Sequence, residues 1–450
     1  MKAKRILALL FAVLMAVCCL TACGETTKPA TTDPATDGTQ AATQGGELAF
    51  VPWSDEDIAD MGAAIKEEAA GNKITLKVWQ PEAAQDVFKA QVAKFQEIFK
   101  DYAEIEIEVA IQGEGDAGAA VISDPNTAAD VFGFASDQIM KLAKPGAISE
   151  ITFKPEVTSM NSAESVAAAT FDGKLVAYPE VGDNSYFLCY DKTVVTDEQA
   201  KSLEAIFEAC VASNKRFIMD AGNSYFACTF PFTGGLATDG LEADGETQKF
   251  NDYDIDQVTA AVKAFADLFK KYSANFESNT TSAVVDGFKN GTTAAGVIGS
   301  WDVASAKAAL GDNAGFAVLP TIEINGTATQ MKNMFGYKFI GVNSQSKALY
   351  TANALAYYLT NEECQMERAQ KLEWGPSNIN VANSDYVAGN ASMSAILKQA
   401  ESSVPQTVIV GTFWTPMDAL GKYVADPKNA FETAEVKAEV EKCINNILDL

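Results

Sequence analysis

The sequence contains no histidine among its 450 residues. Imidazole is therefore unavailable as a general acid or base, as a zinc ligand, or as a member of a Ser-His-Asp triad. Cysteine is sparse in the body of the chain, where the residues are scattered, odd in number and contain no CxxC pair. We interpret them as small buried apolar side chains. We expect no catalytic residue, no metal and no cofactor. The cysteines in the body of the chain are Cys189, Cys210, Cys228, Cys364 and Cys443.

Positive charge is also in short supply, with 34 Lys and Arg against 60 Asp and Glu and a formal net charge of −26. An acidic surface repels nucleic acid and anionic membranes, so neither is expected as a direct partner. The length exceeds what a single hydrophobic core usually accommodates, which favours two lobes.

The N-terminus has the pattern of a targeting segment. Lys2, Lys4 and Arg5 precede an apolar run over residues 6–20 that is too short for an ordinary membrane span. The run ends in LTAC at Cys23, which resembles the bacterial lipoprotein signal. We therefore expect residues 1–22 to be a signal peptide and Cys23 to be lipidated. The alternative is a plain secretory signal with a chance cysteine.

Two further segments precede the globular body. Residues 23–47 are rich in Thr, Ala, Pro and Gly and have few apolar side chains, so they predict a disordered tether. Residues 48–71 are expected to form an N-terminal helical extension that packs on the first lobe. Its helix begins after Ser54, with acidic residues in the first turn.

From residue 72 onward the hydrophobic pattern is that of an α/β protein. Strand-like alternation at 74–79 and 105–111 and an apolar run at 128–136 are separated by a helical pattern at 87–102. Ligands bind beyond the carboxyl ends of the strands in such sheets. The second half repeats this mixture. It predicts helices at 199–211, 256–272, 283–288, 349–360 and 362–372. It predicts strands at 216–220, 294–298, 315–320 and 337–342, with a polar connection between the last two. The segments 221–235 and 411–417 are expected to be irregular.

A central stretch, residues 170–191, connects the two halves. It predicts a strand at 174–178, a polar bend at 181–185 and a second strand at 186–190. Such a bend either closes a hairpin or carries the chain from one domain to the next. We favour the second interpretation, because α/β patterns lie on both sides. Asp183, Asn184 and Tyr186 would then lie on the floor of an interdomain cleft.

Several segments resemble one protein family: DVFGFASD at 130–137, DGKLVAYP at 172–179, FKNGTTAAGVIGSW at 288–301, FAVLP at 316–320, TNEE at 360–363 and Phe413-Trp414. They are similar to the extracellular solute-binding proteins of ABC importers, in the cluster that includes the maltose/maltodextrin-binding proteins. The resemblance runs from about residue 73 to the C-terminus. It implies a two-lobed periplasmic-binding-protein-like clamp, each lobe an α/β sheet flanked by helices, joined by a multi-segment hinge. The expected lobes are 72–182 with 325–373, and 183–324 with 374–450.

The resemblance also implies a sugar site in which aromatic faces stack on the rings and carboxylates or amides bind hydroxyls. Three positions differ from the maltodextrin binder, which has an arginine, a glutamate and a tryptophan in place of Gln138, Asn223 and Phe134. The resemblance therefore does not imply that the ligand is maltose itself. Other roles compete: Asp137 as a helix N-cap, Trp301 as a core residue, and Trp374 as hinge packing or ligand contact. The expected ligand residues are Glu82, Phe134, Asp137, Asp183, Asn184, Tyr186, Asn223, Tyr225, Trp301 and Trp414.

The function implied is capture of a neutral sugar, such as a maltodextrin, by hinge closure and delivery to the permease subunits of an ABC importer. The protein is expected to be a monomer that is lipid-anchored through Cys23 on the extracellular face of the cell membrane. One alternative is a binder of another solute such as a polyamine, since acids and aromatics also suit cations. The other is a secreted carbohydrate-active enzyme with paired carboxylates. No catalytic motif supports an enzyme. The expected cleft positions also include Asn where a catalytic pair of carboxylates would be needed.

Overall fold

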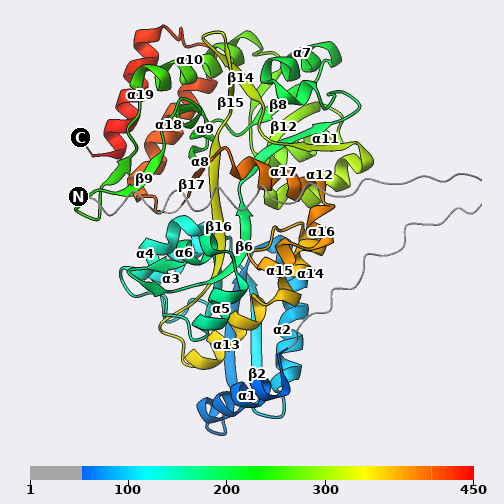
Figure 1. Cartoon of the computed structure of the whole chain (residues 1–450), viewed down its shortest axis with the longest axis vertical. Coiled ribbons are helices and arrows are strands. Elements are labelled where there is room, and N and C mark those ends of the chain that lie inside the picture. The colour runs from blue at the N-terminus through cyan, green and yellow to red at the C-terminus, as the bar shows by residue number, and fades with distance from the viewer. Residues whose placement is uncertain (1–52, 407, 450) are drawn as a thin grey trace, which may run out of the picture. The chain divides into compact units, whose positions relative to one another are not determined.

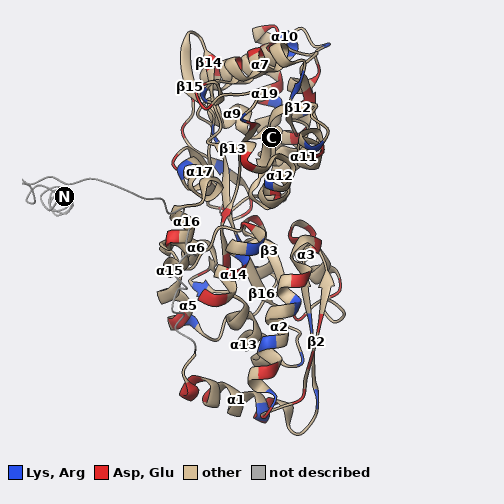
Figure 2. Ribbon diagram, turned by 90° about the vertical axis from the view of Figure 1, so that its right-hand side faces the viewer, with Lys and Arg blue, Asp and Glu red and all other residues tan. Residues whose placement is uncertain are grey.

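The structure is a computed structural model that describes residues 53–406 and 408–449. The predicted signal peptide, the predicted lipidation site Cys23 and the predicted tether lie outside these residues. Residues 47–450 form one compact unit, which contains two α/β lobes (Figure 1). Both signs of charge are distributed over both lobes (Figure 2). None of the helices in the described part of the chain has the length and apolarity that a membrane crossing needs.

The sheet of the first lobe has the strand order β17-β16-β3-β1-β2, with β6 also pairing with β16. Strands β1, β2 and β3 are parallel, as the strand–helix–strand pattern predicts, whereas β16 runs antiparallel to both β3 and β6. The strands are β1 (Ile74–Gln80), β2 (Ile105–Ile111), β3 (Val131–Ala135), β6 (Tyr178–Asn184), β16 (Asn333–Val342) and β17 (Ser403–Pro405), beside a small pair, β4 (Thr170–Phe171) and β5 (Lys174–Leu175).

Helices surround this sheet (Figure 1). They are α1 (Asp55–Ala69), α2 (Gln85–Phe99), α3 (Glu114–Ser123), α4 (Ile139–Ala143), α5 (Lys154–Met160), α6 (Ala163–Ala168), α13 (Leu349–Leu359) and α14 (Glu362–Leu372). The predicted N-terminal helix is confirmed as α1. The Ser54 hydroxyl accepts from Asp57 N at 3.1 Å, while the Asp57 carboxylate accepts from Ser54 N at 3.1 Å, a capping box. Met61 and Ile65 of α1 enter the first lobe's core.

The sheet of the second lobe has the order β11-β8-β12-β7-β13. Its strands are β7 (Tyr186–Asp191), β8 (Arg216–Met219), β11 (Phe276–Ser278), β12 (Thr293–Gly299) and β13 (Ala314–Ala317), accompanied by two separate hairpins, β9 (Thr238–Leu241) with β10 (Gln248–Phe250) and β14 (Thr321–Ile324) with β15 (Thr327–Gln330). The helices are α7 (Leu203–Ser213), α8 (Ser224–Ala227), α9 (Thr229–Thr233), α10 (Ile255–Lys271), α11 (Thr281–Lys289), α12 (Val303–Leu310), α17 (Ala391–Ala400), α18 (Trp414–Ala425) and α19 (Thr433–Ile447). Two short helices, α15 (Ile379–Ala382) and α16 (Asp385–Ala388), lie beside α14 in the first lobe and share a hydrophobic cluster with it (Figure 1).

Strand alternation explains why both faces of the second sheet are covered. Tyr186, Leu188 and Tyr190 of β7 point into the large core of the second lobe. Phe187 and Cys189, the residues between them, point into a smaller cluster on the opposite face. A strand buried on both faces needs this uninterrupted apolar sequence.

Three segments connect the cores of the two lobes. One is the junction of β6 and β7, because Val181 belongs to the first core and Tyr186 to the second. Another is β16, whose Met334 and Phe339 belong to different cores. The third follows Trp374, the last residue of the first core. The multi-segment hinge is thus present, and the boundaries chosen for the lobes remain predictions.

Some local predictions were wrong. Residues 181–184 are not a bend but part of β6, because they pair with β16 and are almost entirely buried. The segment 221–235 contains α8 and α9, and its Asn223 side chain accepts from Tyr225 N at 3.0 Å. Residues 321–330 form a hairpin turned by Asn325 and Gly326, both with positive φ. Helix α18 begins at Trp414, inside the predicted interruption.

Candidate functional site

A cavity of about 760 Å³ is lined by residues that belong to both lobes. The first lobe contributes the start of α3 and the segment from Asp137 to Pro145. The second lobe contributes Ile409, Gly411 and Trp414, around the start of α18. The structure therefore brings together two predicted site residues, Asp137 and Trp414, that are far apart in the sequence.

Asp137 lies in the short 3₁₀ turn that follows β3, beyond the carboxyl end of a sheet strand. It makes no helix cap, since α4 begins after Gln138, so the N-cap alternative is wrong. Burial raises the pKa of the Asp137 carboxyl to about 7, and the charge of Lys141 opposes that rise. A partly buried carboxyl that makes no cap is suited to accept hydrogen bonds from ligand hydroxyls.

Two further predicted ligand residues, Trp301 and Tyr225, contact each other in the second lobe and are not among the residues that line this cavity. Trp301 follows β12, is partly buried at the edge of the core, and has its ring centroid 6.1 Å from that of Tyr225. The Tyr225 hydroxyl donates to the backbone carbonyl of Asn184 at 3.1 Å. Gly299 permits this arrangement, because a Cβ there would lie 2.2 Å from the Trp301 ring. The indole therefore folds back over the end of its own strand.

Lys338 was not among the predicted site residues. It lies in β16 opposite Ala135 and Val181, and only 4% of it is exposed. Its ammonium nitrogen is 3.1 Å from Glu114 Oε2 and 3.2 Å from Glu114 Oε1. The signal in the sequence was a single lysine inside the apolar strand YKFIGV, since a buried lysine needs a partner.

Two carboxyls of β6 are buried beside this lysine. Asp183 accepts from the backbone N–H of Gly375 at 2.7 Å, and burial raises its pKa to about 6. Burial likewise raises the pKa of Glu180 to about 7, against the pull of Arg368, whose Nε lies 3.8 Å away. Neither oxygen of Glu180, nor Oδ1 of Asp183, has a hydrogen-bond partner in the described part of the chain.

Five predicted ligand residues lie elsewhere in this conformation. Phe134 and Tyr186 are completely buried in the two cores, and the Tyr186 hydroxyl contacts that of Thr229 at 2.8 Å. Asn184 is buried and donates to Gln406 Oε1 at 3.2 Å. Asn223 is exposed and caps α8, and Glu82 is exposed at the end of β1. Their assignment to ligand binding stays a prediction.

Metal and thiol chemistry find no support at these positions. Residues 53–406 and 408–449 hold no group of three or more acids or cysteines placed to bind a metal ion. The five cysteines are free and buried, as predicted. Burial raises the pKa of the Cys228 thiol, near Tyr186, to about 12.

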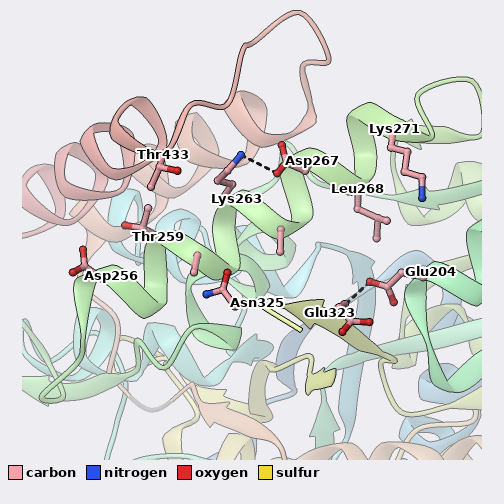
Figure 3. Close-up of a pocket in the computed structure, with 12 residues that line it drawn as sticks. Glu204, Asp256, Thr259, Lys263, Asp267, Leu268, Lys271, Glu323, Asn325 and Thr433 are labelled. Atoms are coloured by element: carbon pink, nitrogen blue, oxygen red, sulfur yellow. Dashed lines mark hydrogen bonds and ion pairs between the residues drawn. The ribbon is translucent and has the colours of Figure 1, made fainter. Parts of the chain in front are cut away.

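A second groove, of about 540 Å³, lies along α10 on the second lobe (Figure 3). Some of its charged side chains have partners within the groove. Lys263 lies 2.8 Å from Asp267, and Glu204 accepts from the backbone N–H of Glu323 at 2.9 Å. It belongs to one lobe, whereas the cavity with Asp137 and Trp414 is built by two.

Two α/β lobes joined by several segments, with a cavity lined by both, define a clamp-type binding protein. Residues 90–395 match the family of bacterial extracellular solute-binding proteins. The chain belongs to this family, which confirms the resemblance inferred from its sequence.

Individual relatives agree with this assignment. The chain is 27% identical over 403 residues to a galactooligosaccharide-binding protein of Bacillus subtilis (strain 168), covering 84% of this chain and 91% of that protein. A solved structure of a protein with acarbose has a TM-score of 0.76 at 28% identity, covering 84% of this chain and 99% of the other. The maltodextrin-binding protein from L. casei BL23, without ligand, has a TM-score of 0.70 at 23% identity, with coverage of 83% and 98%.

Proposed function

We propose that this protein captures a neutral oligosaccharide between its lobes and delivers it to the permease of an ABC importer. The observation that carries the proposal is that Asp137 of the first lobe and Trp414 of the second line one cavity. An indole offers a flat apolar face to a sugar ring, and a carboxylate accepts hydrogen bonds from hydroxyls. Binding of galacto-oligosaccharide by a relative and the presence of acarbose in another structure support this ligand class.

The protein binds its ligand without turning it over. Hydrolysis of a glycosidic bond requires two carboxyl groups flanking that bond. Among the described residues that line the cavity, Asp137 is the only carboxylate. The solute-binding family and the named relatives also support a binding role.

The test is calorimetric titration of the full-length protein with maltodextrins and galacto-oligosaccharides of increasing length, followed by analysis of the sugars recovered. We expect saturable binding of at least one oligosaccharide, with a Kd near micromolar, or about −8 kcal/mol. The sugar should be recovered intact. Release of shorter sugars would support an enzyme, and heat from no sugar at all would contradict the proposal.

We further propose that Cys23 carries the lipid anchor, that the protein works as a monomer on the extracellular face of the membrane, and that the membrane is contacted only through the anchor. The LTAC sequence at Cys23 supports this. Replacing Cys23 with Ser should move the protein from the membrane fraction into the medium. Retention of the variant in the membrane fraction would contradict the anchor.

A further inference from the structure

The first lobe buries a cation, Lys338, that the binding of a neutral sugar does not require. Lysine is almost never fully buried unless it is paired, and only 4% of Lys338 is exposed. Its partner is Glu114 at the start of α3, with both carboxylate oxygens within 3.2 Å of the ammonium. The neighbouring residue Gly115 lines the cavity that contains Asp137 and Trp414. Glu114 is thus adjacent in sequence to a residue that lines the cavity, whereas Lys338 is not itself one of the lining residues.

Two tryptophans also contact this ammonium. Lys338 Nζ lies 5.5 Å from the ring centroid of Trp301, which belongs to the second lobe, and 5.1 Å from that of Trp374, at the third crossing. Both distances are within the range of a cation–π interaction. The lysine thus occupies the aromatic faces that an organic ammonium ion would otherwise use.

The immediate surroundings of Lys338 are acidic, although Lys141 and Lys144 line the cavity itself. Besides Glu114, the carboxyls of Glu180, Asp183 and Asp302 lie close enough for the Lys338 charge to act on them. Glu180 and Asp183 also retain buried oxygens without a hydrogen-bond partner in the described residues. Acids combined with indoles are the chemistry of sites for alkylammonium ligands.

We propose that Lys338 determines the charge class of the ligand, because its ammonium fills the aromatic faces and thereby excludes amines. A cationic ligand that approached these indoles would meet a like charge, whereas an uncharged polyol would meet no such repulsion. Repulsion built against the wrong ligand is a recognised source of specificity. The inference deepens the proposed function by naming amines as the class of ligand that is rejected. It rests on the proposed function only in taking neutral sugars as the class that is accepted.

The test replaces Lys338 with a neutral residue and measures binding of amines. Lys338→Met keeps most of the apolar stem and removes the ammonium, so it should bind spermidine or putrescine at least about tenfold more tightly than the unaltered protein. Lys338→Gln, whose amide still donates to Glu114, should show the same gain with less disturbance of folding. Lys338→Arg, which keeps the charge, should show none. Lys215→Met is the matched control, since Lys215 is a poorly exposed lysine 3.3 Å from Asp191 within the second lobe.

The outcomes separate this inference from the proposed function. Amine binding gained by both neutral variants supports the inference even if no sugar binds to any form. Folded neutral variants that bind sugar but gain no amine binding would overturn the inference and leave the function standing. Tight amine binding by the unaltered protein would also overturn it. Failure of both neutral variants to fold would assign Lys338 a structural role and overturn it too.

Discussion

The carboxylate of Asp183 accepts a hydrogen bond from the backbone N–H of Gly375 at 2.7 Å. Next to it, the backbone N–H of Gly182 donates to the carbonyl of Gly375 at 2.8 Å. Two of the segments that connect the lobes are therefore held together by one backbone–backbone hydrogen bond and by one bond to the Asp183 side chain. Glycine is required at this crossing, because a Cβ on Gly375 would lie 2.4 Å from the Asp183 carboxyl.

Gly375→Ala should therefore destabilise the protein by about 1–3 kcal/mol, the usual cost of overpacking, and weaken ligand binding by disturbing the hinge. Thermal unfolding and calorimetry measure the two effects. Gly222→Ala is the control, since the nearest atom to its Cβ would be a flexible Lys422 carbon at 3.4 Å. Equal stability of the two alanine variants would show that the crossing tolerates a side chain.

Stability should fall as pH rises from about 4 to 7. Burial raises the pKa of Asp183 to about 6 and that of Glu180 and Asp137 to about 7, so the folded protein binds more protons in this window than the unfolded chain. Burial costs each carboxyl least free energy when it is protonated. For Asp183 the raised pKa corresponds to a change of about 3 kcal/mol at most in the free energy of unfolding. Denaturant unfolding between pH 5 and 8 checks the sign.

A matched variant isolates one of these groups. Glu180→Gln keeps the size of the side chain and removes its titration, so it should flatten the loss of stability between pH 5 and 7. An unfolding free energy that rises over this range would show that the buried carboxyls have stronger partners than the structure gives them.

Trp414→Ala should weaken oligosaccharide binding by about tenfold or more, because loss of one stacking aromatic is worth about 1–3 kcal/mol. Trp53→Ala is the control. Trp53 stacks on Tyr357 at 5.2 Å between ring centroids in the first lobe, so its loss should lower the melting temperature without changing the affinity. Equal affinity losses in both variants would place the sugar elsewhere.

Asp137 and Trp414 were proposed as ligand residues because each lies in a segment that resembles the family, and the structure places both in the lining of one cavity. Burial of Phe134 and Tyr186 could not be predicted in the same way. Each lies in a sheet strand, and which faces of that strand are covered depends on elements that are distant in the chain. Lys338 was missed because an apolar strand pattern describes burial but not the partner that makes a buried charge tolerable.

The most direct test of the central claim is hydrogen–deuterium exchange with and without a bound oligosaccharide. A ligand held between the lobes predicts simultaneous protection of residues 137–145 in the first lobe and 408–414 in the second. Protection confined to one lobe, or to the groove along α10 (Figure 3), would contradict the account.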